Sequence, residues 1–525
     1  MKKLTLITII AVVVGIIGVF VYKFGAPILK ARNKNKADIE TSDARATKGR
    51  ITIGVDSWAG YFPLRSQRLK KEMLREGYLL VCEDDKADYK SRMDRLEKGE
   101  FDLIVATVDT YILNAVKAQY PGAIIAVIDE SKGDAICAYK DAFPNLEALK
   151  TNKIQKIAFT PNSASHHLLK VAGAHFDIPV LRTLPSKMRL ETEGSEGALD
   201  LLKNRKVSIA VLWEPDVSKA LEIPGVEKLL GTEQTKRVVV DVAIANRKII
   251  QEHPETLDIL LKAYFRVLKY YNSNSDDLRN EFASEMHVKT VVAEKSIQGV
   301  RWVTLTENAE SWFGISSQGQ TGEQGLVDTI ESTVEILIDA KDFSTHPIPK
   351  KNPYHIINSD FIKNLYKSGV RFGFTNLAPA ALGTGQGIEA RFSVLSETAW
   401  RMQKPIGTMK IEPINFKSGT GELTLEGKEE LDRIAAKIKH YPTFRIGVSG
   451  HTDIGGDEET SKILSKERAD AVAKYFEATY SVDPNRMYAV GHGGSRPLPR
   501  LPDEPDRAYG FRLRRVEITL LTEVY

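Results

Sequence analysis

The sequence predicts an α/β protein with two unlike folded parts, and three observations support this class. Residues 51–245 alternate between short apolar runs and amphipathic stretches, which is the pattern of parallel strands joined by helices. Residues 430–520 combine an amphipathic stretch with alternating apolar residues, which predicts a smaller α+β domain. Residues 4–22 contain no charged side chain and are long enough for a transmembrane helix.

Length, charge and cysteine content narrow the class further. The 525 residues are enough for roughly two to four domains. A net charge of +4, from 73 basic and 69 acidic residues, does not call for a nucleic-acid partner. Cys82 and Cys137 are too few for a metal cage or a disulfide framework, and their apolar surroundings predict buried free thiols. A single bridge between them stays open as the alternative for an oxidising compartment.

The apolar stretch at residues 4–22 predicts a membrane anchor. As a helix it would cover about 28 Å, close to the hydrocarbon thickness of a bilayer. A cleavable signal peptide is the alternative, but its apolar core is usually shorter, and residues 24–27 make a poor cleavage site. We therefore predict an uncleaved anchor at residues 1–23 and a polar tether at residues 24–50.

The long middle part of the chain carries two sets of strand and helix patterns. The first set has predicted strands at 51–55, 78–81, 102–106 and 123–128, with helices at 64–76 and 89–96. The second set has predicted strands at 156–159, 207–212 and 238–245, with helices at 163–174 and 195–204. Two such sets in one chain predict a bilobal fold over residues 51–367 with a cleft between the lobes.

The loops that follow these strands are the candidate ligand site, because ligands of open α/β sheets bind beyond the carboxyl ends of strands. Polar and aromatic side chains gather there. The candidates are Ser57, Trp58 and Tyr61, then Thr107 and Asp109, then Ser163, Ser165 and His166, then Trp213 and Glu214, and finally Asp241. Free amides at the helix start near Ser163 favour an acceptor or an anion.

Charge in these loops nevertheless favours a neutral or cationic solute. Acidic residues lie at or near the strand ends, namely Asp56, Asp109, Glu214 and Asp241, and the loop motifs contain no arginine. Recognition of a carboxylate or sulfonate usually uses a fixed cation. We expect a ring-like solute between Trp58 and Trp213, oriented by Glu214. The alternatives are that the tryptophans pack the lobes together and that the acids cap helices or face water.

A second candidate site lies near the C-terminus. Asp453 ends a predicted strand at residues 445–449, and Arg468 follows fifteen residues later on a predicted helix, after a turn marked by Gly455 and Gly456. A zwitterionic ligand needs such an acid for its ammonium group and a forked cation for its carboxylate. The alternative is a surface ion pair that contributes little.

Residues 410–525 resemble the OmpA-like peptidoglycan-associated domain. The matching segments are residues 414–416, 423–428, 450–453, 464–465, 468–469, 488–493 and 514–518. The resemblance implies that Asp453 and Arg468 hold the two ends of diaminopimelate in the stem peptide of peptidoglycan, with Thr452 and Arg514 in the same site. The family usually carries asparagine where Ser461 and Leu513 stand, so two side-chain contacts to the peptide differ here.

Residues 50–345 resemble the nitrate-, sulfonate- and taurine-type solute-binding proteins of ABC importers. The matching segments are residues 58–61, 98–102, 163–167 and 210–215. The resemblance implies a two-lobed binder that closes about a hinge, with an inner-membrane permease or sensor as a partner. Some relatives are thiamine-pyrimidine synthases, but their cysteine-rich, iron-dependent pattern is absent here. We therefore expect no catalytic residue, no cofactor and no metal site.

These predictions combine into an envelope protein with an anchor, a tether, a solute-binding module at residues 51–367, a linker at 368–409 and a wall-binding domain at 410–525. Because a wall-binding domain must lie outside the cytoplasm, the N-terminus is expected inside and the bulk of the chain in the periplasm. The expected partners are peptidoglycan and a small solute. In the alternative function, the bilobal module grips a partner protein and its cleft binds no solute.

Overall fold

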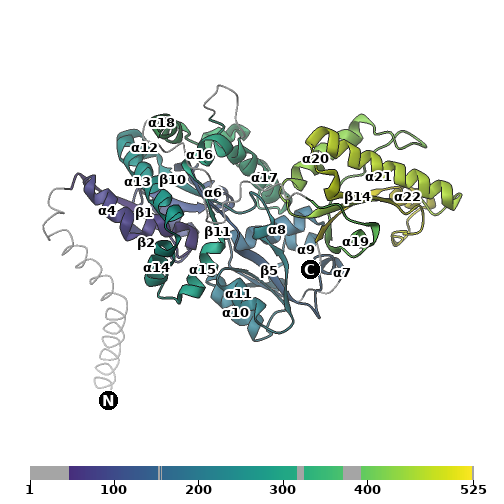
Figure 1. Cartoon of the computed structure of the whole chain (residues 1–525), viewed down its shortest axis with the longest axis horizontal. Coiled ribbons are helices and arrows are strands. Elements are labelled where there is room, and N and C mark those ends of the chain that lie inside the picture. The colour runs from purple at the N-terminus through teal and green to yellow at the C-terminus, as the bar shows by residue number, and fades with distance from the viewer. Residues whose placement is uncertain (1–46, 152–153, 155, 316–323, 370–391, 523–525) are drawn as a thin grey trace, which may run out of the picture.

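The computed structural model describes residues 47–151, 154, 156–315, 324–369 and 392–522 (Figure 1). The predicted anchor at residues 1–23 and most of the predicted tether lie outside this range. Among the helices that are described, none combines the length and the apolar character needed to cross a membrane. The described residues form three β-sheets, one in each of two lobes and one in a C-terminal domain.

The first lobe is built on a mixed sheet of six strands in the order β11-β4-β10-β3-β1-β2. Its strands are β1 (Gly49–Val55), β2 (Tyr78–Asp84), β3 (Leu103–Thr107), β4 (Gly122–Ser131), β10 (Val240–Asn246) and β11 (Val300–Trp302). β1 pairs with β2 and β3 in parallel, whereas β10 is antiparallel to both β3 and β4. The α/β class predicted from the alternating pattern is confirmed in this lobe.

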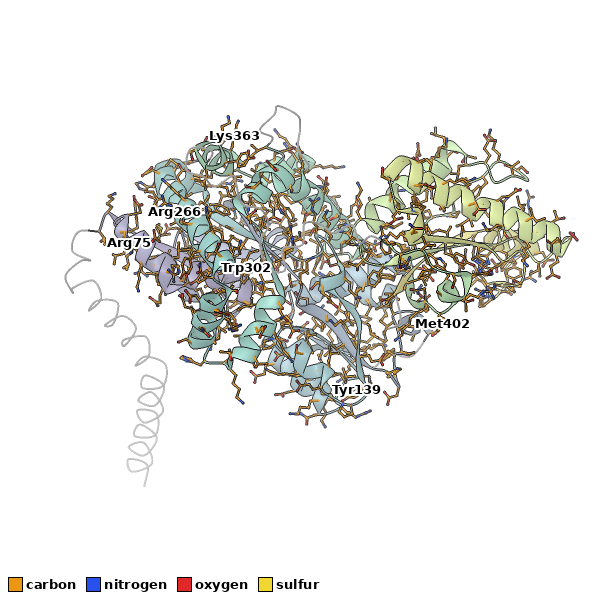
Figure 2. All side chains as sticks on the ribbon, in the orientation of Figure 1. Arg75, Tyr139, Arg266, Trp302, Lys363 and Met402 are labelled. Atoms are coloured by element: carbon orange, nitrogen blue, oxygen red, sulfur yellow. The ribbon has the colours of Figure 1, made fainter. Side chains whose placement is uncertain are left out.

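Helices cover both faces of this sheet because its strands are apolar on both sides. In β3, Leu103 and Val105 pack into one apolar layer, and Ile104 and Ala106 pack into the other. The helices of the lobe are α3 (Phe62–Arg65), α4 (Gln67–Arg75), α5 (Tyr89–Glu97), α6 (Val108–Ala115), α12 (Arg247–Glu252), α13 (Pro254–Ser273), α14 (Ser275–Met286), α15 (Thr290–Gln298), α16 (Leu305–Glu307), α17 (Gly325–Asp339) and α18 (Asp360–Gly369). Trp302, labelled in Figure 2, lies inside this lobe and donates a hydrogen bond of 2.8 Å from Nε1 to the carbonyl oxygen of Gly60.

The second lobe has a five-stranded sheet in the order β7-β6-β8-β5-β9. Its strands are β5 (Asp134–Tyr139), β6 (Ile157–Phe159), β7 (Arg189–Glu191), β8 (Ile209–Trp213) and β9 (Val226–Gly231). Its helices are α7 (Ala148–Thr151), α8 (Ala164–His175), α9 (Pro179–Arg182), α10 (Gly194–Lys203) and α11 (Asp216–Leu221). The chain enters this lobe between β4 and β5 and leaves it between β9 and β10, so these two crossings form the hinge of a bilobal fold.

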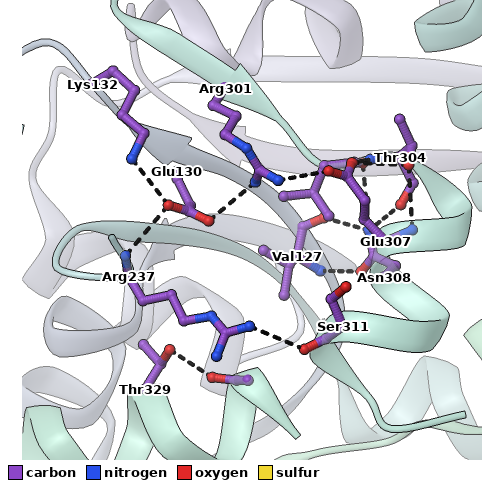
Figure 3. A network of polar contacts seen from close by, with 12 residues as sticks. Val127, Glu130, Lys132, Arg237, Arg301, Thr304, Glu307, Asn308, Ser311 and Thr329 are labelled. Atoms are coloured by element: carbon purple, nitrogen blue, oxygen red, sulfur yellow. Dashed lines mark hydrogen bonds and ion pairs between the residues drawn. The ribbon is translucent and has the colours of Figure 1, made fainter. Parts of the chain in front are cut away.

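Ion pairs and hydrogen bonds around the buried side chain of Glu130, in β4, stabilise the hinge (Figure 3). Glu130 accepts a hydrogen bond of 3.2 Å from Lys132 Nζ and one of 3.0 Å from Arg301 Nη1. The backbone N–H of Arg237 adds a third at 3.3 Å, and Arg301 also pairs with Glu307 at 2.6 Å. Burial alone would raise the pKa of Glu130, but Lys132 and Arg301 together lower it below its ordinary value.

The C-terminal domain has a four-stranded sheet in the order β12-β15-β13-β14, with its two longest helices on one face. Its strands are β12 (Lys404–Thr408), β13 (Arg445–Gly450), β14 (Met487–Gly491) and β15 (Val516–Thr522), and its helices are α19 (Glu397–Arg401), α20 (Leu425–Ile438), α21 (Glu458–Tyr480) and α22 (Asp506–Leu513). Ile446 and Val448 of β13 face the apolar side chains of α20 and α21. The alternating apolar residues predicted this packing of helix on sheet.

The C-terminal domain is joined to the second lobe by a continuous contact (Figure 1). Phe176 lies against Tyr441 with ring centroids 5.5 Å apart, and both belong to one apolar cluster that spans the two parts. His175 Nδ1 lies 2.7 Å from the Tyr441 hydroxyl. The backbone N–H of Lys236 donates to the His440 carbonyl at 2.8 Å, and that of Lys410 donates to the His175 carbonyl at 2.7 Å. Apolar and backbone contacts together hold the second lobe and the C-terminal domain as one unit.

Several elements differ from the sequence-based prediction. The helix predicted at residues 64–76 is divided at Ser66, whose Oγ accepts a hydrogen bond of 3.2 Å from the Leu69 N–H and so begins α4 as a new helix. β12 lies within the stretch predicted as a linker at residues 368–409, where it pairs with β15. Cys82 and Cys137 are both free thiols.

Candidate functional site

A cavity of about 660 Å³ lies between the two lobes. It is lined from the first lobe, from the hinge and from the second lobe. Seven of the predicted solute-binding residues line it, namely Ser57, Trp58, Tyr61, Thr107, Ser163, Trp213 and Asp241. Residues up to 184 positions apart, from Ser57 to Asp241, therefore meet in one cavity. This is the edge of the sheet at which ligands of open α/β folds bind.

Trp58 and Trp213 face the cavity from opposite lobes. Trp58 follows β1, and its indole Nε1 donates to Asp129 Oδ1 at 3.3 Å while its backbone N–H donates to Asp56 Oδ1 at 2.9 Å. Trp213 ends β8, and its backbone N–H donates to Ser195 Oγ at 3.1 Å. Both indoles remain partly exposed, so each presents an aromatic surface to the space between the lobes.

Three of the predicted residues lie behind the cavity wall. Asp109 is buried at the start of α6 beside Thr110. Ser165 and His166 are buried in the first turn of α8, where the His166 ring packs on Phe159 with centroids 4.8 Å apart. Burial lowers the pKa of His166 to about 2, so the ring is neutral. These side chains support the cavity wall from behind.

Glu214 was expected to orient the solute, and its contacts in the structure are different. Its carboxylate accepts hydrogen bonds from the Ser218 N–H at 3.1 Å and from the Ser218 hydroxyl at 2.9 Å. It thereby satisfies a free donor in the first turn of α11. Its side chain borders a neighbouring hollow of about 330 Å³, beside Lys219 and Ser296, rather than the main cavity.

The hinge side of the main cavity holds a group of acids that sequence reasoning missed. Asp129 ends the apolar run of β4 and lies directly opposite Asp241 of β10 in the sheet register. Asp134 begins β5, where it accepts a hydrogen bond of 2.5 Å from Ser131 Oγ, and it lines the cavity together with Asp241. Tyr61 donates its hydroxyl proton to Asp241. An acid inside an otherwise wholly buried strand is the signal that could have found Asp129.

These acids are difficult to ionise. Burial raises the pKa of Asp134 to about 7, and it also raises the pKa of Asp129 to about 7 in spite of the hydrogen bond from Trp58. Burial, and then repulsion from Asp129, raise the pKa of Asp241 well above its ordinary value. The part of the chain that the structure describes places no cation within ion-pair distance of these three carboxyl groups.

Arg92 is a buried cation near the cavity, and it is already paired. Arg92 of α5 is wholly buried, and its guanidinium contacts Asp56 at 3.0 Å and Asp85 at 2.5 Å. It also donates to the Val105 carbonyl at 2.5 Å. Arg92 therefore neutralises the acids that follow β1 and β2, and it fixes the loop that carries Trp58.

The second candidate site lies on the C-terminal domain, at the ends of β13 and β14. Asp453 follows β13, and Arg468 points from α21 with its Nε donating to the Thr420 carbonyl at 3.1 Å. Arg514 Nε lies 3.9 Å from Asp453 Oδ2. The described residues include no ion pair between Asp453 and Arg468, and the carboxylate of Asp453 lies nearest to Arg514 instead.

Close backbone packing sets the spacing of this second site. A Cβ atom on Gly450 would lie 2.0 Å from the Ser465 carbonyl, and one on Gly491 would lie 2.5 Å from the Lys462 carbonyl. Both glycines therefore let the strand ends approach α21 closely enough to align Asp453 with Arg468. Thr452 is held by its backbone N–H, which donates to the Gly493 carbonyl at 2.9 Å.

The two positions that depart from the family pattern have different surroundings. Leu513 is wholly buried at the end of α22, so this side chain contributes to the apolar core. Ser461 is half-buried in the first turn of α21 and lies near Gly493. Across the described residues, no cluster of histidine, cysteine or acidic side chains is arranged to hold a metal ion.

Comparison with known proteins identifies the C-terminal domain. Residues 415–508 match the OmpA family. The chain is 35% identical over 94 residues to outer membrane porin F of Pseudomonas aeruginosa, covering 18% of this chain and 26% of that protein. It is 33% identical over 119 residues to the peptidoglycan-binding protein ArfA of Mycobacterium tuberculosis, covering 23% and 35%.

A further relative is the photosystem I P700 chlorophyll a apoprotein A2 of Gloeobacter violaceus, 33% identical over 153 residues, which are 28% of this chain and 17% of that protein. The chain thus spans between 17% and 35% of the length of these three relatives.

Solved structures of solute-binding proteins resemble the two-lobed part. The aliphatic sulphonate binding protein SsuA of Escherichia coli is 15% identical with a TM-score of 0.45, covering 59% of this chain and 99% of that chain. The nitrate-binding protein NrtA of Synechocystis PCC 6803 is 13% identical with a TM-score of 0.47, covering 63% and 92%.

The two sheets and their paired hinge crossings define a fold of the periplasmic-binding-protein type. The chain joins this fold to an OmpA-family domain at residues 415–508. The predicted combination of the two is therefore confirmed.

Proposed function

We propose that this protein is a receptor of the cell envelope that binds a small solute between its lobes and holds peptidoglycan through its C-terminal domain. The observation that carries the first part is the cavity of about 660 Å³, which is bordered by both lobes and by the hinge. Its size and its mixture of aromatic and polar walls fit a small-molecule site. Ser57, Trp58, Tyr61, Thr107, Ser163, Trp213 and Asp241 are the proposed contacts.

The second part of the proposal rests on the separate charges of Asp453 and Arg468. A diaminopimelate residue offers an ammonium and a carboxylate at one end, and these groups complement an acid and a guanidinium. Thr452 and Arg514 complete the proposed peptidoglycan site beside them. The family match and the peptidoglycan-binding role that names the mycobacterial relative support this assignment.

Membrane attachment completes the proposal. Residues 4–22 would form a single inner-membrane span, with the body of the chain from residue 51 to residue 525 in the periplasm. In this arrangement the solute-binding part, at residues 51–367, and the wall-binding part, at residues 410–525, act outside the membrane without catalysis. An inner-membrane permease or sensor is the proposed recipient of the solute signal.

A ligand screen with the full-length protein in detergent tests the solute site. A solute present at about 100 times its Kd should stabilise the fold by about 2.7 kcal/mol, which a thermal shift detects. Trp58→Leu should abolish the shift without lowering the transition temperature of the free protein by a similar amount. If no solute class gives a shift while a periplasmic protein co-purifies through the two lobes, the alternative function as a partner-gripping scaffold is favoured.

A further inference from the structure

Two carboxyl oxygens near the cavity are buried without a hydrogen-bond partner. Asp134 is 2% exposed, and its Oδ1 has no partner although its other oxygen accepts from Ser131. Asp129 is 0% exposed, and its Oδ2 has no partner either. Leaving a buried polar atom unsatisfied costs about 1–3 kcal/mol, so a site of this kind needs a donor from elsewhere.

Carboxyl groups without a cationic partner among the described residues gather at the deep end of the cavity. Asp134 and Asp241 line the hinge side, and Asp129 lies behind them in the same sheet. The lysines that border the cavity, Lys86 and Lys90, are exposed at its mouth. Because Arg92 already pairs with Asp56 and Asp85, its charge is not available to the deep carboxyl groups.

Aromatic rings surround the same space. Trp58 and Tyr61 border it from the first lobe, Tyr89 borders it from α5, and Trp213 borders it from the second lobe. The face of an aromatic ring attracts a cation, and this attraction is strongest for tryptophan and for desolvated groups. The wall therefore offers carboxyl oxygens at one end and ring faces along the sides.

We infer that the cleft takes an organic cation, whose ammonium group lies against Asp134 and Asp241 and whose carbon skeleton lies between Trp58 and Trp213. The inference rests on the proposed solute-binding function and names the class of solute. An ammonium group supplies the donors that Asp134 Oδ1 lacks, and its positive charge favours the ionised form of the hinge carboxyl groups, whose ionisation burial otherwise opposes. The hinge acids, rather than Glu214, are thus the groups that recognise charge.

The test compares matched ligands on the full-length protein in detergent by calorimetric titration and thermal shift. Putrescine and dimethylbutylamine, whose ammonium groups donate hydrogen bonds, are the cationic probes. Dimethylbutanol is the uncharged isostere of dimethylbutylamine, and taurine and nitrate are the remaining probes. We expect a shift with at least one cation and none with the isostere. Asp134→Asn should weaken that binding at least about tenfold, because hydrogen bonds to charged groups contribute roughly 1.5–3 kcal/mol.

Control variants separate charge recognition from general effects. Glu196→Gln removes one exposed acid of the second lobe outside the main cavity and should leave cation binding unchanged. Asp241→Asn provides a second test should Asp134→Asn fold poorly, and circular dichroism monitors the fold of both.

Binding of taurine or nitrate that survives Asp134→Asn and is lost in Trp58→Leu would overturn the inference and keep the receptor function. Absence of a shift with both cations counts against the inference, and absence with every class counts against the receptor function itself.

Discussion

The two candidate ligand sites hold their charges in opposite ways. In the cleft, the carboxyl groups of Asp129 and Asp134 are buried, and Arg92 is wholly buried against Asp56. On the C-terminal domain, the side chains of Asp453 and Arg514 are 39% and 46% exposed and lie 3.9 Å apart. Water compensates the second pair when a partner is lost, but it does not reach the first group.

Because of this difference, we expect the two sets of charges to affect different properties of the protein. Changes to the charges of the cleft should alter the free energy of unfolding, because a buried charge without a partner destabilises the fold itself. Changes to the exposed charges should alter ligand binding and leave folding almost unaffected. The following predictions test this separation, beginning with the largest expected effect.

The first prediction concerns the buried cation. Arg92→Met should lower the free energy of unfolding by about 3–5 kcal/mol, because Asp56 and Asp85 lose their partner in a buried setting. Urea denaturation measures the change. Arg95→Met on the same helix is the control, since Arg95 is partly exposed and its pairs with Glu83 and Glu100 should contribute only about 0–1 kcal/mol. Equal losses of unfolding free energy in the two variants would contradict the difference between buried and exposed charges.

The second prediction concerns pH. The pKa of Asp134 is about 7 in the folded chain, which is above its ordinary value, so the folded form holds a proton that the unfolded chain releases from about pH 4 upward. The stability from this group is present at low pH and is lost as the pH rises towards 7. Asp134→Asn does not titrate, and it should therefore gain roughly 2–4 kcal/mol relative to the wild type between about pH 4.5 and about pH 8. Urea denaturation at both pH values measures the gain, and a difference that does not change with pH would refute the buried-acid assignment.

The third prediction concerns the exposed site. Asp453→Ala and Arg468→Ala should each weaken co-sedimentation with purified sacculi about tenfold or more, since hydrogen bonds to charged groups contribute roughly 1.5–3 kcal/mol. Arg507→Ala changes an exposed arginine of α22 and serves as the control. Sedimentation of both variants at the wild-type level would show that Asp453 and Arg468 do not hold the wall peptide.

The smallest effect is expected for the contribution of the same site to the free energy of unfolding. Asp453→Asn removes the ion pair with Arg514 and should change the free energy of unfolding by no more than about 1 kcal/mol, because both side chains are well exposed. A larger loss in urea denaturation would mean that this pair is structural, and the contrast between the two sites would fail.

The candidate peptidoglycan site is more local in the sequence than the cleft, and this makes its residues easier to predict together. The residues Thr452, Asp453 and Arg468 lie within seventeen positions, so one local motif of strand, turn and helix carries them. The cleft is assembled from segments between Asp56 and Asp241, and no local pattern sets how their side chains point. The post-strand loops were predictable because strand direction fixes where loops gather.

The missed features depend on tertiary packing. Arg92 resembles any charged residue of an amphipathic helix, and only the fold shows that it points inward at Asp56. Asp129 and Asp134 flank Glu130, and the sequence does not distinguish the acid that meets Lys132 and Arg301 from the two that meet no cation. Likewise, β12 is a strand because β15 lies beside it, and its own residues, which include Pro405 and Gly407, do not favour a strand.

The contact between the second lobe and the C-terminal domain has a mechanical consequence. His175, Phe176 and Tyr441 hold these two parts together. The first lobe meets the second through the hinge and through ion pairs that join Asp339 of α17 to Arg182 and Asp342 to Lys170. A closing rotation of the cleft that pivots on these contacts displaces Thr47, where the described chain begins in the first lobe, relative to the C-terminal domain. If the chain is fixed to the membrane before Thr47 and to the wall beyond β13, the length that it spans depends on whether the cleft is occupied. In such a protein, the distance between the two attachment points would vary with the concentration of the solute.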